Sequence, residues 1–138
     1  MLTDGAGIPL GLAVDGANRP DMKMAKATVQ STPVKRPKVT DDQPQHLCLD
    51  AGYDYDAVHE LLDEWGFTAH IRPRYAEAEA KKRIPGYRAR RWVVERTHSW
   101  LNRFRRLLIR WEKKVENYLA LLHFACAWIT FRAADVFG

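Results

Sequence analysis

The chain has 138 residues, which suits one small domain or part of a larger one. Hydrophobic residues make up 46% of it, including five tryptophans, so the composition excludes a disordered chain. The formal net charge is +5, and neither a signal peptide nor an apolar run long enough for a membrane span is evident. We therefore expect a globular cytoplasmic protein without a membrane partner.

Turn residues divide the first half of the chain into short segments. Gly5–Gly7 separate two apolar stretches and indicate a hairpin, and three prolines make residues 31–45 a surface loop or linker. Helical spacing of apolar residues predicts two long helices at the C-terminal end. The expected elements in chain order are strand 1–4, strand 8–14, helix 21–29, strand 46–49, helix 54–65, strand 68–72, helix 88–114 and helix 116–136.

This order of strands and helices indicates an α/β fold. In open α/β sheets, functional side chains gather at the carboxyl ends of the strands. Asp50 directly follows the apolar strand 46–49, so it is a candidate site residue. Cys48 and Cys126 both lie in apolar runs without a C-x-x-C motif, and we expect both to be small buried residues.

Positive charge is concentrated between Lys81 and Lys114. This stretch has 13 basic and two acidic residues, a net charge of +11, whereas the remainder of the chain carries a net charge of −6. Basic runs are often solvated surface, but so many like charges on one segment repel one another in the absence of a polyanion. The segment therefore predicts contact with nucleic acid.

Glu95 is one of the two acidic residues in this basic segment. On a helical projection, the face opposite Glu95 is apolar and consists of Val93, Trp100, Phe104, Leu107 and Trp111. The face around Glu95 is polar and consists of Arg88, Arg91, Ser99, Asn102 and Arg106. Two interpretations follow: Glu95 neutralises its basic neighbours, or it is a metal ligand flanked by arginines that bind phosphates.

Other prominent side chains have structural interpretations. Trp65 and Trp111 lie on apolar faces and are expected in the core, and Trp92 is expected to pack rather than to stack on a DNA base. Asp54 is expected to cap the helix that follows it. His98, one turn after Glu95, is expected to be a hydrogen-bonding surface residue rather than a ligand.

Two stretches carry a family resemblance. His46-Leu-Cys-Leu-Asp50-Ala-Gly-Tyr-Asp54 resembles the strand that bears the second catalytic Asp of insertion-sequence DDE transposases. Arg91-Trp-Val-Val-Glu95-Arg-Thr-His-Ser-Trp-Leu-Asn-Arg-Phe-Arg-Arg-Leu107 is similar to the helix that bears their third carboxylate. Residues 3–10 and 16–21 match the segment before the second Asp, so the resemblance covers nearly the whole chain.

The resemblance implies a partial RNase H-like fold over residues 1–138, with a mixed sheet, a hairpin, flanking helices and long C-terminal helices. It assigns Asp50 and Glu95 as catalytic carboxylates that hold two Mg²⁺ ions, for which Mn²⁺ can substitute. Arg91 matches the arginine of the family's Tyr–Arg–Glu–Lys signature, whereas Asn102 stands where the signature has lysine. The DNA-binding residues that it implies are Arg88, Arg91, Arg96, Asn102, Arg103 and Arg106.

The first catalytic Asp of the family lies upstream of the segment at which this chain begins. Asp4 and Asp15 do not match its position and are interpreted as turn and loop residues. We therefore expect an incomplete transposase catalytic domain that is inactive in DNA transposition by itself. Its expected partners are double-stranded DNA at transposon ends, an upstream transposase polypeptide and a second copy of the chain.

Two other functions remain open at this stage. The first is a non-enzymatic DNA-binding or regulatory remnant of a transposase. The second is a basic α/β nucleic-acid-binding domain with no link to transposition. If Asp50→Ala and Glu95→Ala leave Mg²⁺ and Mn²⁺ binding unchanged, the interpretation of the two carboxylates as metal ligands is wrong.

Overall fold

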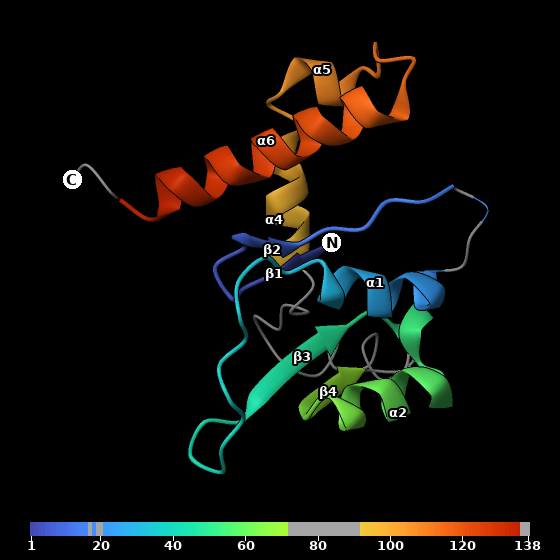
Figure 1. Cartoon of the computed structure of the whole chain (residues 1–138), viewed down its shortest axis with the longest axis vertical. Coiled ribbons are helices and arrows are strands. Elements are labelled where there is room, and N and C mark those ends of the chain that lie inside the picture. Colours follow the sequence, from blue (N-terminus) through green and yellow to red (C-terminus); the bar gives the residue numbers. More distant parts are fainter. Residues whose placement is uncertain (17, 19–20, 72–91, 136–138) are drawn as a thin grey trace, which may run out of the picture.

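The computed structural model describes residues 1–16, 18, 21–71 and 92–135, and these form a mixed α/β arrangement (Figure 1). The elements in chain order are β1 (Leu2–Thr3), β2 (Pro9–Gly11), η1 (Asp21–Met24), α1 (Ala25–Gln30), β3 (Gln45–Leu49), η2 (Ala51–Tyr53), α2 (Asp56–Glu64), β4 (Phe67–Ile71), α4 (Trp92–Leu101), α5 (Arg105–Leu108) and α6 (Val115–Ala133). The predicted hairpin, the strand before Asp50, the helix after it and the last apolar helix are therefore all present.

The strands form two separate pairs. β1 and β2 pair antiparallel, and β3 and β4 pair parallel with Leu47 opposite Ala69. Among the described residues these pairs are separate two-stranded sheets, rather than the one mixed sheet that we expected. In Figure 1 the hairpin lies between the β3–β4 pair and the helices α4 and α6.

The parallel pair packs against α2. Val58 and Leu62 of this helix are buried, together with Leu47 of β3, and form what we call the strand cluster. The four-residue spacing of Val58 and Leu62 puts both on the face that covers the strands. The helix ends before Gly66, whose φ of +68° is the left-handed conformation that glycine adopts most easily at a helix C-terminus.

The C-terminal helices form a second core. Leu101 of α4 and three residues of α6, Leu122, Ala125 and Ile129, are its buried members, and we call this group the helix cluster. The hairpin joins the two cores, because Met1 packs against the helix cluster and its neighbour Leu2 against the strand cluster. Successive side chains of an extended chain point to opposite faces, so Met1 and Leu2, the first residue of β1, can pack on different clusters.

The predicted long helix 88–114 is confirmed from Trp92 to Leu101, but its continuation as one helix beyond Leu101 is wrong. α4 ends at Leu101, residues 102–104 form a turn, and α5 covers only Arg105–Leu108. Phe104 has an extended backbone (φ −85°, ψ 95°), which breaks the helical path. A helix of that length would extend about 40 Å in a straight line. The turn instead keeps Phe104 and Leu107 against the helix cluster under α6.

Two side chains predicted to be buried are exposed. Trp111 follows α5 in an irregular segment and is 71% exposed, because the helical face that would have buried it ends before it. Cys48 is exposed because it alternates with the buried Leu47 along β3 and so faces the opposite side. Cys126 is half-buried against the helix cluster, and Trp65 is half-buried at the end of α2.

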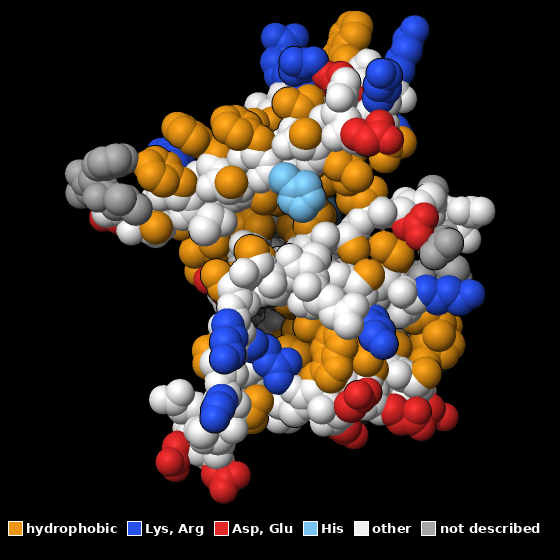
Figure 2. Space-filling view, in the orientation of Figure 1, with side chains coloured by type: hydrophobic (Ala, Val, Ile, Leu, Met, Phe, Trp, Pro, Cys, Tyr) orange, Lys and Arg blue, Asp and Glu red, His pale blue; other side chains and the backbone are white. Residues whose placement is uncertain are grey.

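α6 is the longest described helix, yet its solvent side is rich in aromatic residues. Phe124, Trp128 and Phe131 are 64%, 47% and 42% exposed, and the rings of Trp128 and Phe131 stack with centroids 5.9 Å apart. Figure 2 shows hydrophobic side chains along the exposed side of this helix. Across the described ranges, no helix has both the length and the apolar character that crossing a membrane requires.

Candidate functional site

Asp50 lies where β3 ends. Its backbone is extended (φ −69°, ψ 156°), and its Oδ1 accepts a hydrogen bond from the Gly52 N–H at 3.1 Å. Asp50 therefore caps the short 3-10 turn η2, which carries the chain from the strand towards α2. The predicted position of Asp50 at the carboxyl end of a strand is confirmed, and its side chain is exposed.

Glu95 lies in the first turn of α4 and is also exposed. The direction in which it points is fixed by Thr97, which is fully buried on the opposite side of the helix. The Thr97 hydroxyl donates to the Gly7 carbonyl at 2.5 Å and thereby attaches α4 to the hairpin turn. Glu95 consequently faces away from the hairpin.

Gly7 makes this attachment possible. Its φ is +87°, and a Cβ atom there would lie 3.2 Å from the Thr97 hydroxyl and 3.3 Å from the Val93 carbonyl oxygen. Asp4 organises the same turn, because its Oδ1 accepts from the N–H groups of Ala6 at 2.9 Å and Ile8 at 2.8 Å. The interpretation of Asp4 as a turn residue is therefore confirmed.

Arg96 is held inside this junction. Its guanidinium donates to the Ala6 carbonyl at 3.2 Å and lies 4.1 Å from the centre of the Trp92 ring and 5.8 Å from that of Trp100. A cation over an aromatic face is attracted by the ring's electrons. These contacts give Arg96 and Trp92 a role in attaching α4 to the hairpin.

The other predicted DNA-binding residues occupy different settings. Asn102 and Arg103 are exposed in the turn after α4. Arg106, in α5, forms an ion pair with Glu112. Arg88 and Arg91 lie outside the described residues.

His98 is one helical turn from Glu95 on an exposed part of α4. Partial desolvation of its ring lowers its pKa below the ordinary value of 6.5, and the positive N-terminal amine lowers the pKa further. The neutral imidazole is therefore favoured in the folded chain. Burial raises the pKa of the Cys126 thiol. The positive N-terminal amine lowers that pKa by a smaller amount.

The two predicted metal ligands belong to different parts of the fold, since Asp50 follows β3 and Glu95 is on α4. Over the described ranges, no group of three or more His, Cys, Asp or Glu side chains is close enough to hold a metal ion. The described residues thus supply two exposed carboxylates but not a complete three-ligand set. Asp54, predicted to cap α2, instead hydrogen-bonds to His59 at 3.0 Å.

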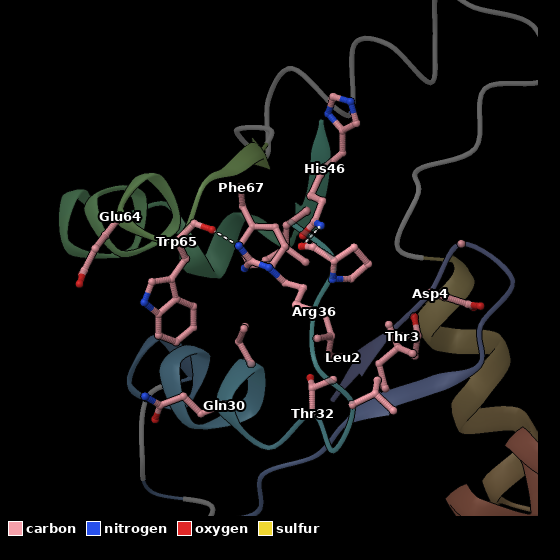
Figure 3. A pocket seen from close by; sticks show the side chains of 17 residues that line it. Leu2, Thr3, Asp4, Gln30, Thr32, Arg36, His46, Glu64, Trp65 and Phe67 are labelled. Atoms are coloured by element: carbon pink, nitrogen blue, oxygen red, sulfur yellow. Dashed lines mark hydrogen bonds between the residues drawn. The ribbon is translucent and has the colours of Figure 1, made fainter. Parts of the chain in front are cut away.

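A pocket of about 810 Å³ lies between the hairpin, α1 and the start of β3 (Figure 3). Arg36 crosses it, with its guanidinium 4.1 Å from the centre of the Phe67 ring and a hydrogen bond to the Trp65 carbonyl. No sequence pattern indicates this pocket, because its walls come from four segments that are distant along the chain. Figure 2 shows basic side chains beside the hollow.

Two comparisons with known proteins return transposases. The sequence model of the family "Transposase DDE domain" matches residues 47–132, which include both Asp50 and Glu95. A Burkholderia cepacia protein described as a transposase for insertion sequence element IS402 is 34% identical over 147 residues, covering 98% of this chain. The chain spans 64% of that relative's length. No solved structure matches the chain significantly. The chain belongs to the DDE transposase family of insertion sequences.

Proposed function

We propose that this chain is part of a transposase catalytic domain and that it serves metal-dependent cleavage and transfer of DNA strands. The observation that carries the proposal is the family match over residues 47–132, a range that includes the two exposed carboxylates that we propose as metal ligands. Under this proposal, residues 1–138 form one portion of an RNase H-like catalytic domain.

The donor atoms of Asp50 and Glu95 suit Mg²⁺ or Mn²⁺, because hard divalent ions prefer carboxylate oxygens. Both carboxylates are exposed, and the hydrogen bond from Gly52 orients that of Asp50. A pair of such ions, when bound, activates the attacking water or hydroxyl and stabilises the leaving oxygen. Asp50 and Glu95 would hold the ions, with a third carboxylate supplied by an upstream transposase polypeptide.

Double-stranded DNA at transposon ends is the proposed substrate. Arg103 and Asn102 are exposed in the turn after α4 and can meet phosphates directly. Arg88 and Arg91 lie outside the described residues and are proposed as phosphate contacts because they belong to the same basic segment. Arg106 must first release Glu112, and Arg96 is engaged with the hairpin. These contacts would position the duplex without reading its sequence.

The chain by itself is expected to be inactive, since the described residues gather no third ligand. The test is nicking of a supercoiled plasmid carrying transposon ends, in the presence of Mg²⁺ or Mn²⁺. We expect turnover only after addition of a polypeptide that carries the upstream part of a related transposase. Asp50→Asn and Glu95→Gln should each abolish that turnover while leaving the fold intact. Robust nicking by the isolated chain would contradict the inactivity, and turnover that survives both substitutions would contradict the proposed ligands.

A non-enzymatic role, in which the chain binds DNA or regulates an intact transposase, is the second candidate. It is favoured by the absence of a three-ligand group among the described residues. Addition of the upstream polypeptide separates the two functions. Restored strand cleavage supports the catalytic role, whereas DNA binding with cleavage still absent supports the regulatory role.

A second copy of the chain is a further proposed partner, and the solvent face of α6 is its proposed contact. Exposed residues 120, 124, 127 and 131 follow the 4-3-4 spacing of a coiled-coil seam and alternate between Ala and Phe. If two α6 helices pack antiparallel about a twofold axis, Phe124 meets Ala127 of the other copy, and Ala120 meets Phe131. Large residues then face small ones, which makes the surface complementary to itself.

A further inference from the structure

The outer face of the β3–β4 pair carries side chains that the transposase chemistry does not use. Because the strands are parallel with His46 opposite Thr68 and Cys48 opposite His70, these four residues lie on one face of the pair. The other face, which includes Leu47, is buried in the strand cluster. His46, Cys48, Thr68 and His70 are all exposed.

Two imidazoles meet on this face. The Nδ1 of His46 and the Nε2 of His70 are 2.9 Å apart, and the ring centroids are 5.0 Å apart with planes inclined by 42°. In Figure 3 the ring of His46 points away from the pocket. One ring nitrogen from each of two neighbouring strands thus lies within hydrogen-bond distance of the other on an exposed face.

We infer that His46 and His70 form a cross-strand site for a borderline divalent transition-metal ion, with Zn²⁺ as the representative ion. A tetrahedral zinc with Zn–N bonds of about 2.0–2.1 Å holds its two nitrogens roughly 3.3 Å apart. The observed 2.9 Å needs to widen by only a few tenths of an ångström, and the ion then replaces the hydrogen bond between the rings. The described residues gather no group of three ligands, so water completes the coordination.

This site differs in its chemistry from the proposed carboxylate site. Imidazole nitrogens favour zinc, copper and nickel, whereas Mg²⁺ favours oxygen ligands and keeps its water. Millimolar Mg²⁺ is therefore expected not to displace Zn²⁺ from the histidine pair. The histidine pair depends only on the geometry of β3 and β4, whether or not the chain acts in transposition.

The site has a structural consequence, because its two ligands belong to different strands. An ion bound by both clamps β3 to β4, and this strand pair ends at Asp50. Since such an ion binds the folded chain and not the unfolded one, it raises the melting temperature. Asp50 follows the same strand, four residues after His46, so an ion bound by the two histidines would also stabilise the strand end that positions the Asp50 carboxylate.

The test is titration of the reduced, tag-free chain with Zn²⁺ in the presence of excess Mg²⁺, followed by calorimetry and by melting temperature. We expect one Zn²⁺ per chain and a higher melting temperature. Loss of even an outer partner of a metal ligand weakens binding about 10- to 100-fold, so His46→Gln and His70→Gln should each weaken Zn²⁺ binding at least tenfold. Both histidines are exposed, so the variants should fold normally, which circular dichroism verifies.

Three control variants test whether Zn²⁺ binding is specific to His46 and His70. His123→Gln, on the exposed side of α6, and His59→Gln, whose partner is Asp54, should bind Zn²⁺ as the parent does. Cys48→Ser should retain the site, because the proposed ligands are the two imidazoles. Zn²⁺ binding that survives loss of both His46 and His70, or that is lost only with Cys48, would overturn the inference.

Discussion

At the scale of single residues, the junction of Gly7 with Thr97 is tightly constrained. The glycine has a positive φ, and its carbonyl accepts the hydroxyl of a side chain that is fully buried. Neither residue belongs to the carboxylate pair, yet together they determine where Glu95 points. Sequence reasoning recognised the Gly5–Gly7 turn but could not identify its contact with α4, because the two segments are 90 residues apart.

Gly7→Ala tests this junction. The left-handed conformation disfavours a side chain by about 1–2 kcal/mol, and the added Cβ would press on Thr97 and on the Val93 carbonyl. We expect the free energy of unfolding, measured with urea, to fall by at least that amount. Gly5→Ala is the matched control, since a Cβ at Gly5 meets nothing within 4 Å. Equal stability of the two variants would contradict the importance of the junction.

Arg96 and Arg103 provide a second test at the level of single residues. Arg103→Gln should weaken DNA binding and reduce the slope of log affinity against log salt by about one, because one phosphate contact is lost. Arg96→Gln should instead lower the free energy of unfolding, because Arg96 contacts Ala6 and Trp92. Fluorescence anisotropy in several salt concentrations, together with urea unfolding, distinguishes the two. The assignment fails if Arg103→Gln leaves the salt slope unchanged.

For whole elements, periodicity predicted well where a segment packs along its entire length. The strand before Asp50, the helix after it and α6 all lie close to their predicted ranges, since each buries one continuous face or stripe. The break after Leu101 could not be predicted in this way. The chain turns there because Phe104 and Leu107 pack against the helix cluster, which includes α6. A helical projection of one segment gives no information on its contacts with another segment. The pairing of His46 with His70 likewise depends on strand register.

The exposed face of α6 is predicted to hold two copies of the chain together. Phe124→Ser should shift a concentration-dependent association of the chain towards monomer, because it removes a large residue from the proposed contact between copies. Its stability should change little, since Phe124 is 64% exposed. Val115→Ser, which is 50% exposed on the opposite side of the same helix, should leave association unchanged. Sedimentation velocity over a range of concentrations is the measurement, and a chain that is monomeric at every concentration would contradict the proposal.

At the level of the whole molecule, the two clusters are joined through the first residues of the hairpin. Met1 packs on the helix cluster and Leu2 on the strand cluster, so the hairpin is a wall shared by both. The two predicted metal ligands also divide between these parts, with Asp50 beside the strands and Glu95 on α4. From the sequence, each carboxylate could be assigned to an element, but their mutual placement could not, because it depends on how the two parts pack.

Stability of the whole chain should decrease in mild acid, and His98 should contribute to this decrease. Because folding holds the pKa of His98 below 6.5, the unfolded chain binds the proton more readily. The contribution is absent well above pH 6.5, grows as the pH falls through that value and levels off below the pKa of the folded state. Urea midpoints at about pH 7.5 and 5.5 should therefore differ less in His98→Gln than in the parent. His123→Gln is the control, and an unchanged difference in His98→Gln would contradict the assignment.

The bond between Thr97 and Gly7 also limits how α4 can vary in length. Successive residues of a helix are rotated by about 100° around its axis. Deleting Arg96 would keep Thr97 anchored at the hairpin but turn the carboxylate of Glu95 through that angle, with the charge of the side chain unaltered. Such a deletion would misdirect the acid without removing it, so spacing here is expected to matter as much as residue identity.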